Sequence, residues 1–387
     1  FGDTTKGDYA YESAPNSTDL TWETVITKNI GLDLGFLNNR LNVSFDAYIR
    51  DTKDMLMAGK TLPGVYGASS PRMNVADLRT KGWEASITWG DSFTLASKPF
   101  NYRIMAGIGD NTSKVTKYDN PNRTLTDPYE GQQLGEIWGY VVDGYFKTDE
   151  EARNYKVDQS FVNQMINASA LDNGLHAGDL KFVDLDGNNK IEQTTSANDR
   201  KDMKVIGNSL PRYNYNFGIS ADWYGIDFSV LFQGIGKQNW YPGAETSMFW
   251  GPYSRPYASF IPSDFMSQVW SEENTDAYFP RPRGYVALGS NRELAVVNTK
   301  YLQNLAYCRL KNLSIGYTLP DKWLSKIGFE KIRVYFSGEN LLTFTKLHSD
   351  YIDPEQASAS NSWKTSKSDA NIYPWAKTYS FGVDITF

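Results

Sequence analysis

Residues 378–387, TYSFGVDITF, alternate without interruption between apolar or aromatic side chains and small or polar ones. A period of two residues is typical of a β-strand whose two faces meet different surroundings. The apolar row continues to the last residue, although the terminal residues of a soluble domain usually fray in water. The apolar positions of this strand are Tyr379, Phe381, Val383, Ile385 and Phe387.

The same alternation recurs in eight earlier segments, so we expect nine strands in this chain. In residues 41–49, for example, Leu41, Val43 and Phe45 alternate with Asn42 and Ser44. The eight segments are residues 30–36, 41–49, 83–89, 100–108, 213–222, 226–234, 313–319 and 331–340.

The connections between these segments alternate between short and long. A β-sandwich has no reason to keep this order, whereas short periplasmic turns and long extracellular loops are typical of an outer-membrane β-barrel. The predicted fold is therefore all-β, an antiparallel transmembrane β-barrel. The expected short turns are at residues 37–39, after Trp89, at 223–225 and at 320–331; the expected extracellular loops are at about 56–73, 115–204, 240–297 and 347–372.

In such a barrel the apolar rows face lipid and the polar rows face a water-filled lumen. Backbone groups in lipid must be hydrogen-bonded, so the sheet has to close. Bacterial barrels generally have even strand counts, and we therefore expect further strands before residue 1. The charged residues expected to face the lumen are Asp33, Asp46, Glu84, Arg103, Asp222, Asp227, Arg333, Glu339 and Asp384.

The composition argues against several other classes of protein. The 39 Lys and Arg residues are outnumbered by 45 Asp and Glu residues and form no basic block, which argues against a nucleic-acid partner. No stretch approaches the ~18 apolar residues of a transmembrane helix. One cysteine permits no internal disulfide, and two histidines, His176 and His348, permit no multi-histidine metal centre.

Several stretches together resemble the C-terminal part of a SusC/RagA-like TonB-dependent outer-membrane transporter of the Bacteroidetes type. The resemblance covers nearly the whole chain in the same order, and its motifs are specific in combination. They are residues 20–56, KGWEASITWG (81–90), GEIWGYVVDGYFKTDEEA (135–152), GDLKFVDLDGNNKIE (178–192), residues 199–234, LKNLSIGYTLP (310–320) and the terminal strand.

The resemblance implies a plugged barrel of about 22 strands, of which residues 1–387 would be the C-terminal segment of about nine strands. The N-terminal plug, the TonB-contacting segment and the earlier strands would lie outside this chain. It also implies a location in the outer membrane of a Gram-negative bacterium, import energised by TonB, and a SusD-like surface lipoprotein that caps the barrel. The cargo would be oligosaccharides, or oligopeptides in some relatives, and no enzymatic activity is expected. The terminal strand, Tyr379 to Phe387, resembles the signal that barrel-assembly machinery reads.

The sequence DLDGNNKIE (184–192) is similar to a calcium-binding EF-hand loop. Calcium prefers six to eight oxygen ligands, and side chains at odd positions of a tight loop converge on one point. The position of the usual turn glycine is occupied by Asn189, which tolerates left-handed backbone. The position of the closing carboxylate is Thr195, so we expect an insertion to bulge out and bring Asp199 into place. No cofactor is required, and the expected ligands of a structural calcium are Asp184, Asp186, Asn188, Lys190 by its carbonyl, Glu192 and Asp199. The alternative is a polar turn without metal.

Aromatic residues are frequent in two of the long loops. Flat aromatic side chains suit stacking on sugar rings or contact with peptides, and the alternatives are packing within the loops or contact with a lid protein. The candidates for contact with substrate or lid are Trp138, Tyr140, Tyr145, Trp240, Tyr241, Phe249, Trp250 and Tyr253.

Two other functions are alternatives to active import. A passive porin would lack the plug, and a soluble secreted carbohydrate-binding or glycosidase protein would bury the terminal apolar row in its core. A glycosidase needs a pair of carboxylates in one pocket, and the acids here occur singly. The adjacent residues His348, Ser349 and Asp350 do not suggest a catalytic triad, because triads assemble from distant segments.

Overall fold

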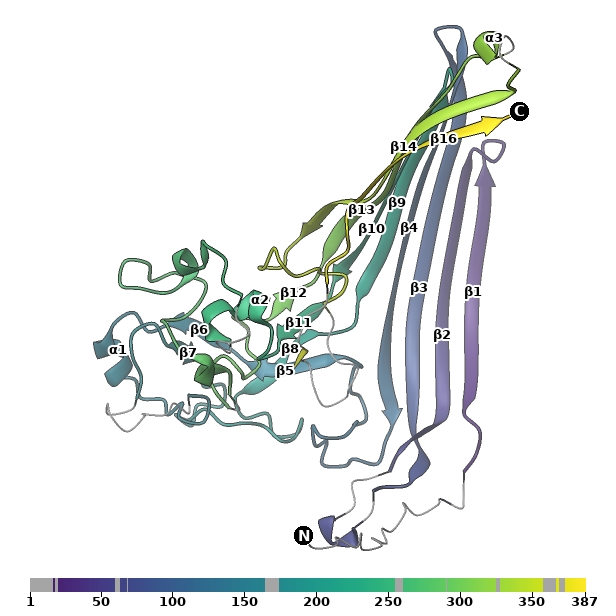
Figure 1. Ribbon diagram of the computed structural model, residues 1–387. Helices are drawn as coiled ribbons and strands as arrows, with labels where there is room; N and C mark the ends of the chain where they lie inside the picture. Colours follow the sequence, from purple (N-terminus) through teal and green to yellow (C-terminus); the bar gives the residue numbers. More distant parts are fainter. Residues whose placement is uncertain are drawn as a thin grey trace, which may run out of the picture.

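The computed structural model describes residues 17, 20–59, 63–67, 69–163, 174–254, 260–289, 291–324, 328–357, 367–368 and 373–387. A long, curved sheet forms one part of the molecule, and a folded region built from the loops lies beside one end of it (Figure 1). We call this region the loop domain, and it comprises the described parts of residues 118–211, 238–306 and 346–368.

The sheet has nine strands, as predicted, and each strand is antiparallel to its neighbours. Their spatial order follows the chain, and the second and third of them are 18 and 24 residues long. Because about 9–11 residues cross the hydrocarbon core, such strands project beyond a membrane. The strands are β1 (Thr24–Phe36), β2 (Leu41–Ala58), β3 (Arg72–Leu95), β4 (Lys98–Lys117), β9 (Arg212–Trp223), β10 (Ile226–Lys237), β13 (Tyr307–Thr318), β14 (Lys331–Thr345) and β16 (Thr378–Thr386).

Tight turns join three of the hairpins at one rim. Ala96 and Ser97 have φ values of 49° and 65°, and Tyr224 and Gly225 have 50° and 84°. Two consecutive positive φ values are those of a type I′ turn, whose twist matches that of the flanking strands. The first turn, at residues 37–40, also has left-handed backbone. The fourth short connection carries α3 (Asp321–Leu324). The long connections all leave the opposite rim, which confirms the predicted alternation.

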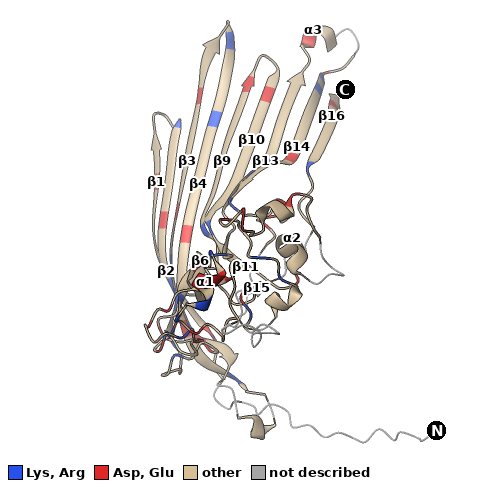
Figure 2. Ribbon diagram, turned by 90° about the vertical axis from the view of Figure 1, so that its left-hand side faces the viewer, with Lys and Arg blue, Asp and Glu red and all other residues tan. Residues whose placement is uncertain are grey.

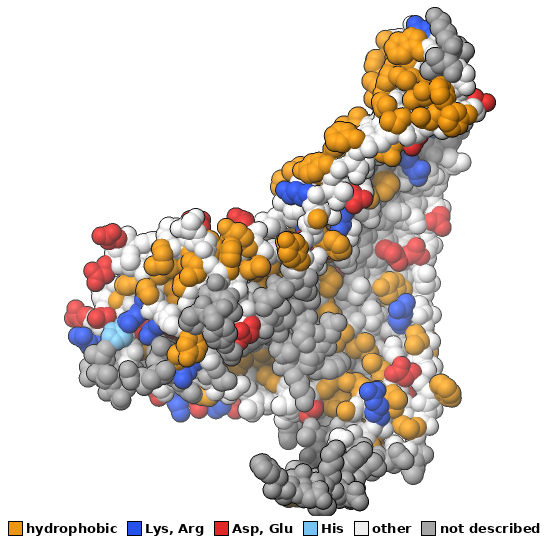
Figure 3. Space-filling model, in the orientation of Figure 1, with side chains coloured by type: hydrophobic (Ala, Val, Ile, Leu, Met, Phe, Trp, Pro, Cys, Tyr) orange, Lys and Arg blue, Asp and Glu red, His pale blue; other side chains and the backbone are white. Residues whose placement is uncertain are grey.

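The register aligns apolar residues into continuous rows on one face of the sheet. Ile315 pairs with Phe336, and Phe336 pairs with Phe381 on the terminal strand. The side chain of Phe381 is 83% exposed, because no second layer covers this face. Hydrophobic side chains gather over the upper, C-terminal part of the sheet in Figure 3, whereas charged positions along the strands are isolated in Figure 2. An uncovered apolar face of this extent is the lipid-facing surface of a membrane barrel.

The loop domain has short elements and its own hydrophobic core. Strand β5 pairs with β8, β6 with β7, and β11 with both β12 and β15. The strands are β5 (Glu136–Tyr140), β6 (Val142–Tyr145), β7 (Leu180–Phe182), β8 (Met203–Asn208), β11 (Asn239–Pro242), β12 (Gln303–Asn304) and β15 (Lys367–Ser368). The helical turns are α1 (Asp149–Arg153), α2 (Ser247–Trp250), η3 (Gly251–Tyr253), η4 (Phe265–Gln268) and η5 (Tyr285–Leu288), and η1 (Gly64–Tyr66) lies in the first long loop.

Within the described part of the chain, no helix has the length and apolar character needed to cross a membrane.

Candidate ligand and metal sites

Seven of the eight aromatic residues expected to contact substrate or lid are buried in the loop domain. Their side chains are at most 8% exposed, and the rings of Trp250 and Tyr301, for example, meet edge to face at 5.2 Å. Two of the polar tips are also occupied within the core: the Tyr253 hydroxyl donates to the Pro280 carbonyl, and the Trp250 indole donates to the Gly243 carbonyl. This burial corrects the expectation of direct contact, because the rings pack against one another instead. The seven are Tyr140, Tyr145, Trp240, Tyr241, Phe249, Trp250 and Tyr253.

Trp138 differs from these seven, because it lines a cavity of about 380 Å³. Its indole nitrogen donates to the Glu136 carboxylate at 3.0 Å, and Tyr129 binds the same oxygen. This volume falls within the usual range of small-ligand sites. The cations of this cavity could not be singled out from the sequence, because Arg123 is far along the chain from Arg200 and Lys204. The lining residues are Arg123, Tyr129, Gly131, Glu136, Trp138, Ala197, Arg200, Lys204 and Val205.

The predicted calcium loop is a tight turn stabilised by its own carboxylates. The two oxygens of Asp184 accept hydrogen bonds from the backbone nitrogens of Gly187 and Asn189, both at 2.7 Å. Asn189 has a φ of 63°, the left-handed conformation expected at the position of the usual glycine. The backbone nitrogen of Asn188 donates to Asp186 at 3.1 Å. The chain therefore adopts the local geometry of such a loop.

The acid that joins Asp184 and Asp186 is Asp202, not the expected Asp199. Oxygens of Asp184, Asp186 and Asp202 all lie within 4.8 Å of one another. Asp202 is fully buried and accepts from the backbone nitrogens of Leu185 and Glu192 at 2.8 and 2.7 Å. The carboxylate of Asp199 instead faces solvent and lies 3.6 Å from the Lys201 ammonium. The closing acid is therefore three residues later than the sequence spacing predicted, at Asp202 instead of Asp199.

The remaining predicted ligands of this loop have other partners. Glu192 lies 3.8 Å from the ammonium of Lys190 and 3.7 Å from that of Lys201, so its charge is already compensated. Asn188 donates its amide to Asp186 and Glu192. Burial raises the pKa of Asp202, and the charges of Asp186 and Asp184 act in the same direction. Burial would also raise the pKa of Asp184, but backbone hydrogen bonds outweigh it and lower this pKa. Three converging carboxylates with this mutual repulsion fit a hard divalent cation, and calcium binding here stays a prediction.

His348, Ser349 and Asp350 do not form a catalytic arrangement. The imidazole of His348 stacks on the Tyr278 ring at 3.5 Å between centroids, and its Nε2 lies 2.8 Å from the Gln268 side-chain oxygen. The Ser349 hydroxyl donates to the Met248 carbonyl at 2.8 Å. The histidine therefore has a packing role.

The model of the family described as TonB dependent receptor-like, beta-barrel, matches residues 2–341. The chain belongs to this family. Its location is the outer membrane, and its sheet is part of a transmembrane β-barrel of the SusC/RagA-like type.

Curated relatives of this TonB-dependent receptor chain include the TonB-dependent receptor P3 of Formosa agariphila, which is 28% identical over 95% of this chain and 34% of its own length. The TonB-dependent receptor SusC of Bacteroides thetaiotaomicron is 24% identical over 100% of this chain and 34% of its own length. The chain thus spans about a third of the relatives that it matches. Among solved structures, that of the RagAB peptide transporter has a TM-score of 0.67 and 21% identity over 96% of this chain and 36% of the matched one, a likeness in fold.

Proposed function

We propose that this chain is the C-terminal barrel segment of a TonB-dependent active importer of oligosaccharides or oligopeptides. The observation that carries the proposal is the nine-stranded meander with an uncovered apolar face, together with the match to TonB-dependent receptors. The segment supplies barrel wall and extracellular loops, while a plug in the remainder of the receptor blocks the lumen. Force transmitted by TonB displaces the plug, and no bond of the cargo is made or broken.

The proposed partner is a SusD-like surface lipoprotein that caps the extracellular rim. The loop domain supports this proposal, because it extends from that rim and carries exposed apolar side chains. Met266 is 62% exposed, and the rings of Phe260 and Tyr351 meet at 4.8 Å. Apolar groups gathered on an extracellular surface are typical of a protein interface. The exposed apolar residues include Phe260, Ile261, Met266, Tyr285 and Tyr351.

The choice between oligosaccharides and oligopeptides needs a cargo measurement. The structure named as a peptide transporter shares the fold at low identity, and similar folds serve many cargoes. We propose oligosaccharides first, because the cavity beside Trp138 offers an indole ring beside hydrogen-bonding groups.

The decisive experiment measures uptake by cells that carry the full-length receptor, with and without the inner-membrane proton gradient. An active importer stops accumulating cargo when the gradient collapses, whereas a passive porin continues to equilibrate it. If a SusD-like lipoprotein caps the barrel, it should co-purify with the receptor in mild detergent. Recovery of the chain in the soluble fraction without detergent would support the soluble carbohydrate-binding alternative.

A further inference from the structure

The cavity beside Trp138 combines positive charge with an aromatic wall. It lies where the strand pair β5–β8 meets the segment that follows β4, and that segment is fixed by backbone hydrogen bonds from Gly131 to Val115 at 2.9 Å and from Leu134 to Ser113 at 2.9 Å. In Figure 1, β5 and β8 lie between the helical turns of the loop domain and the lower end of β4. The cavity is therefore attached to the extracellular end of the barrel wall.

Three cations line the cavity, and none of them has a carboxylate partner in the described part of the chain. Arg200 and Lys204 are exposed and form no ion pair there. Arg123 lies over the Tyr129 ring at 4.8 Å and donates one hydrogen bond, to the Glu130 carbonyl at 3.2 Å. Its Nε is buried without an acceptor. Some other cations of the loop domain do pair with acids, such as Lys181 with Glu151 and Arg283 with Asp179, whereas the three cations of this cavity concentrate uncompensated positive charge around one space.

The one carboxylate of the cavity, that of Glu136, accepts hydrogen bonds from residues close to it in the chain. One oxygen of Glu136 accepts from Trp138 and Tyr129, and the other lies 3.4 Å from the Gln133 nitrogen. The second oxygen therefore retains capacity for another donor. Three cations and one carboxylate line the cavity, so its net charge is positive.

A β-bulge sets the direction of the aromatic wall. Trp138 pairs with Val205 while Ile137 pairs with Gly207, so the register shifts between Ile137 and Trp138. Such bulges re-aim a side chain and are frequent beside binding sites. Val205, the partner of Trp138, is 46% exposed. Indole and valine together form an apolar wall next to the cations.

We propose that this cavity binds an acidic sugar unit of the imported cargo, a uronate or a sulfated pyranose. The proposal rests on the proposed import function and specifies its substrate class. Arginine and lysine side chains bind carboxylate or sulfate, and a flat indole ring matches the apolar face of a pyranose. The second oxygen of Glu136, which has only the long hydrogen bond from Gln133, accepts a hydrogen bond from a hydroxyl of the same sugar. An acidic peptide side chain would bind the cations, but it would neither stack on Trp138 nor donate a hydrogen bond to Glu136.

The test is a binding titration with the full-length receptor in detergent. The probes are trigalacturonate and a neutral galactose trimer of the same length. We expect the acidic trimer to bind at least about tenfold more tightly, since hydrogen bonds to charged groups are the stronger ones, and we expect high salt to reduce this preference. The double variant R200Q/K204Q should abolish the preference.

The matched control is K147Q/R153Q, which also removes one lysine and one arginine from exposed positions of the loop domain, outside the cavity. This control should keep the preference for the acidic trimer, and both double variants should unfold at the wild-type temperature. Equal binding of the two trimers, or a preference that survives R200Q/K204Q, would overturn the proposal. Equally tight binding of a tri-glutamate peptide that also depends on Arg200 and Lys204 would overturn the sugar assignment.

Failure of this inference is distinguishable from failure of the import function. Energised uptake of neutral cargo with no preference for acids would remove the proposed cavity ligand and leave the importer in place. Binding of trigalacturonate without gradient-dependent uptake would support the cavity ligand and contradict active import.

Discussion

The guanidinium of Arg333 on β14 donates hydrogen bonds to Asp227 on β10, at 2.8 and 2.6 Å, across the intervening strand β13. Gly316 on β13 makes this crossing feasible, because a Cβ there would lie 2.5 Å from an Asp227 oxygen and 2.6 Å from Arg333 Nε. Arg333 also lies 3.3 Å from Asp384 on the terminal strand. One arginine thus connects three of the last four strands of this sheet, on the polar face that was predicted to line the lumen.

Substitution of Gly316 by valine should destabilise this part of the barrel. The added side chain displaces Arg333 or Asp227 from a partly buried ion pair, at a cost of about 1–3 kcal/mol. The measurement is the temperature at which the folded full-length receptor loses its anomalous mobility in a denaturing gel. The control is Gly90→Ala on β3, where the new Cβ would meet only the Tyr102 carbonyl at 3.8 Å and should change little. Equal effects of the two substitutions would contradict the role of Gly316.

Truncation of Trp250 and of Trp138 should have opposite consequences. Trp250 is 0% exposed, so Trp250→Ala leaves a large void and should cost the loop domain about 3–5 kcal/mol. Trp138 lines a cavity, so Trp138→Ala should lower stability less and weaken cargo binding more. Denaturant unfolding monitored at the loop domain, combined with the trimer titration, checks both. A destabilised Trp138→Ala variant with normal binding would show that this indole is a packing residue like the other seven aromatics.

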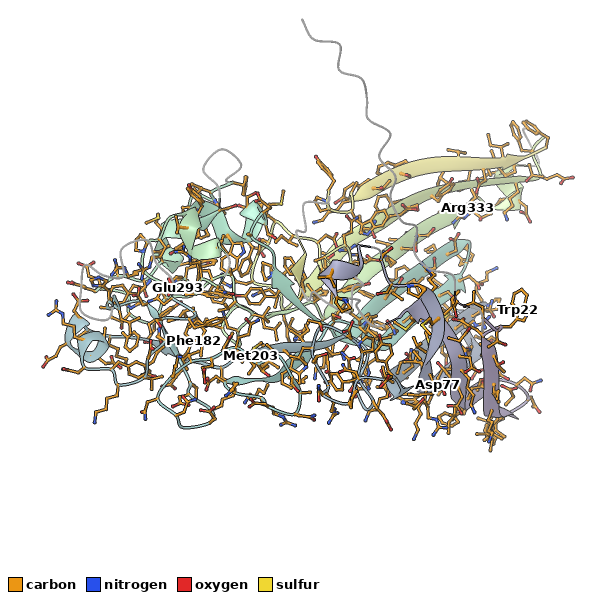
Figure 4. All side chains as sticks on the ribbon, turned by 90° about the horizontal axis from the view of Figure 1, so that it is seen from below. Trp22, Asp77, Phe182, Met203, Glu293 and Arg333 are labelled. Atoms are coloured by element: carbon orange, nitrogen blue, oxygen red, sulfur yellow. The ribbon has the colours of Figure 1, made fainter. Side chains whose placement is uncertain are left out.

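These aromatics show where sequence analysis reached its limit. The strands were predictable, because period-two alternation and turns such as Ala96–Ser97 depend on local chemistry. The loop domain has no such period, and its core forms from segments as distant as Tyr145 and Tyr301, whose hydroxyls lie 3.0 Å apart. An aromatic residue in a long loop therefore could not be assigned to a core or to a binding surface from its type alone. In Figure 4, Phe182, Met203 and Glu293 lie together in this domain, apart from Arg333 on the sheet.

The calcium loop shows a second limit, because an insertion of unknown conformation left its closing acid undetermined. Side-chain spacing pointed to Asp199, whereas backbone hydrogen bonds from Leu185 and Glu192 hold Asp202 beside Asp184. If the loop binds calcium, Asp202→Asn should abolish the rise in loop-domain stability that added calcium produces, and Asp199→Asn should not. Thermal unfolding of the receptor with calcium or with a chelator measures both. The calcium effect should weaken as pH falls through the raised pKa of Asp202, because protons compete for the same oxygen atoms. No calcium effect in the wild-type protein would refute the site.

The terminal strand should control assembly of the receptor. Phe387 is 82% exposed and contacts only Phe329, at 5.3 Å between ring centroids, among the aromatic rings of the described residues. Phe387→Ser should therefore reduce the amount of folded receptor in the outer membrane several-fold while changing the stability of assembled molecules little. Quantification of folded and unfolded receptor in membrane fractions tests this. Tyr373→Ser, at an 89% exposed residue outside the strand, is the control. Normal assembly of the Phe387 variant would exclude a signalling role.

The loop domain contains a buried charge cluster that should make its stability depend on pH. Asp179 and Glu293 are both fully buried, and Arg283 contacts both, with its Nε 3.3 Å from Glu293. Burial raises the pKa of Glu293, and repulsion by Asp179 adds to this effect, while Arg283 opposes it. The folded state therefore keeps the proton of Glu293 at pH values where the unfolded chain, with an ordinary pKa of 4.5, has released it. Since the folded state then binds more protons, the free energy of unfolding falls as pH rises above that value.

Glu293→Gln should remove this dependence, because the amide is isosteric and never ionises. We expect the variant to gain about 1–2 kcal/mol relative to the wild type at pH 8 and little at pH 5. Amide exchange at Leu180, whose nitrogen lies 3.4 Å from a Glu293 oxygen, reports the opening of this region once corrected for intrinsic pH effects. Glu272→Gln, at an exposed site of the same domain, should leave the pH profile unchanged. A variant less stable than the wild type at pH 8 would instead mean that the Arg283–Glu293 ion pair outweighs the cost of burying the charge.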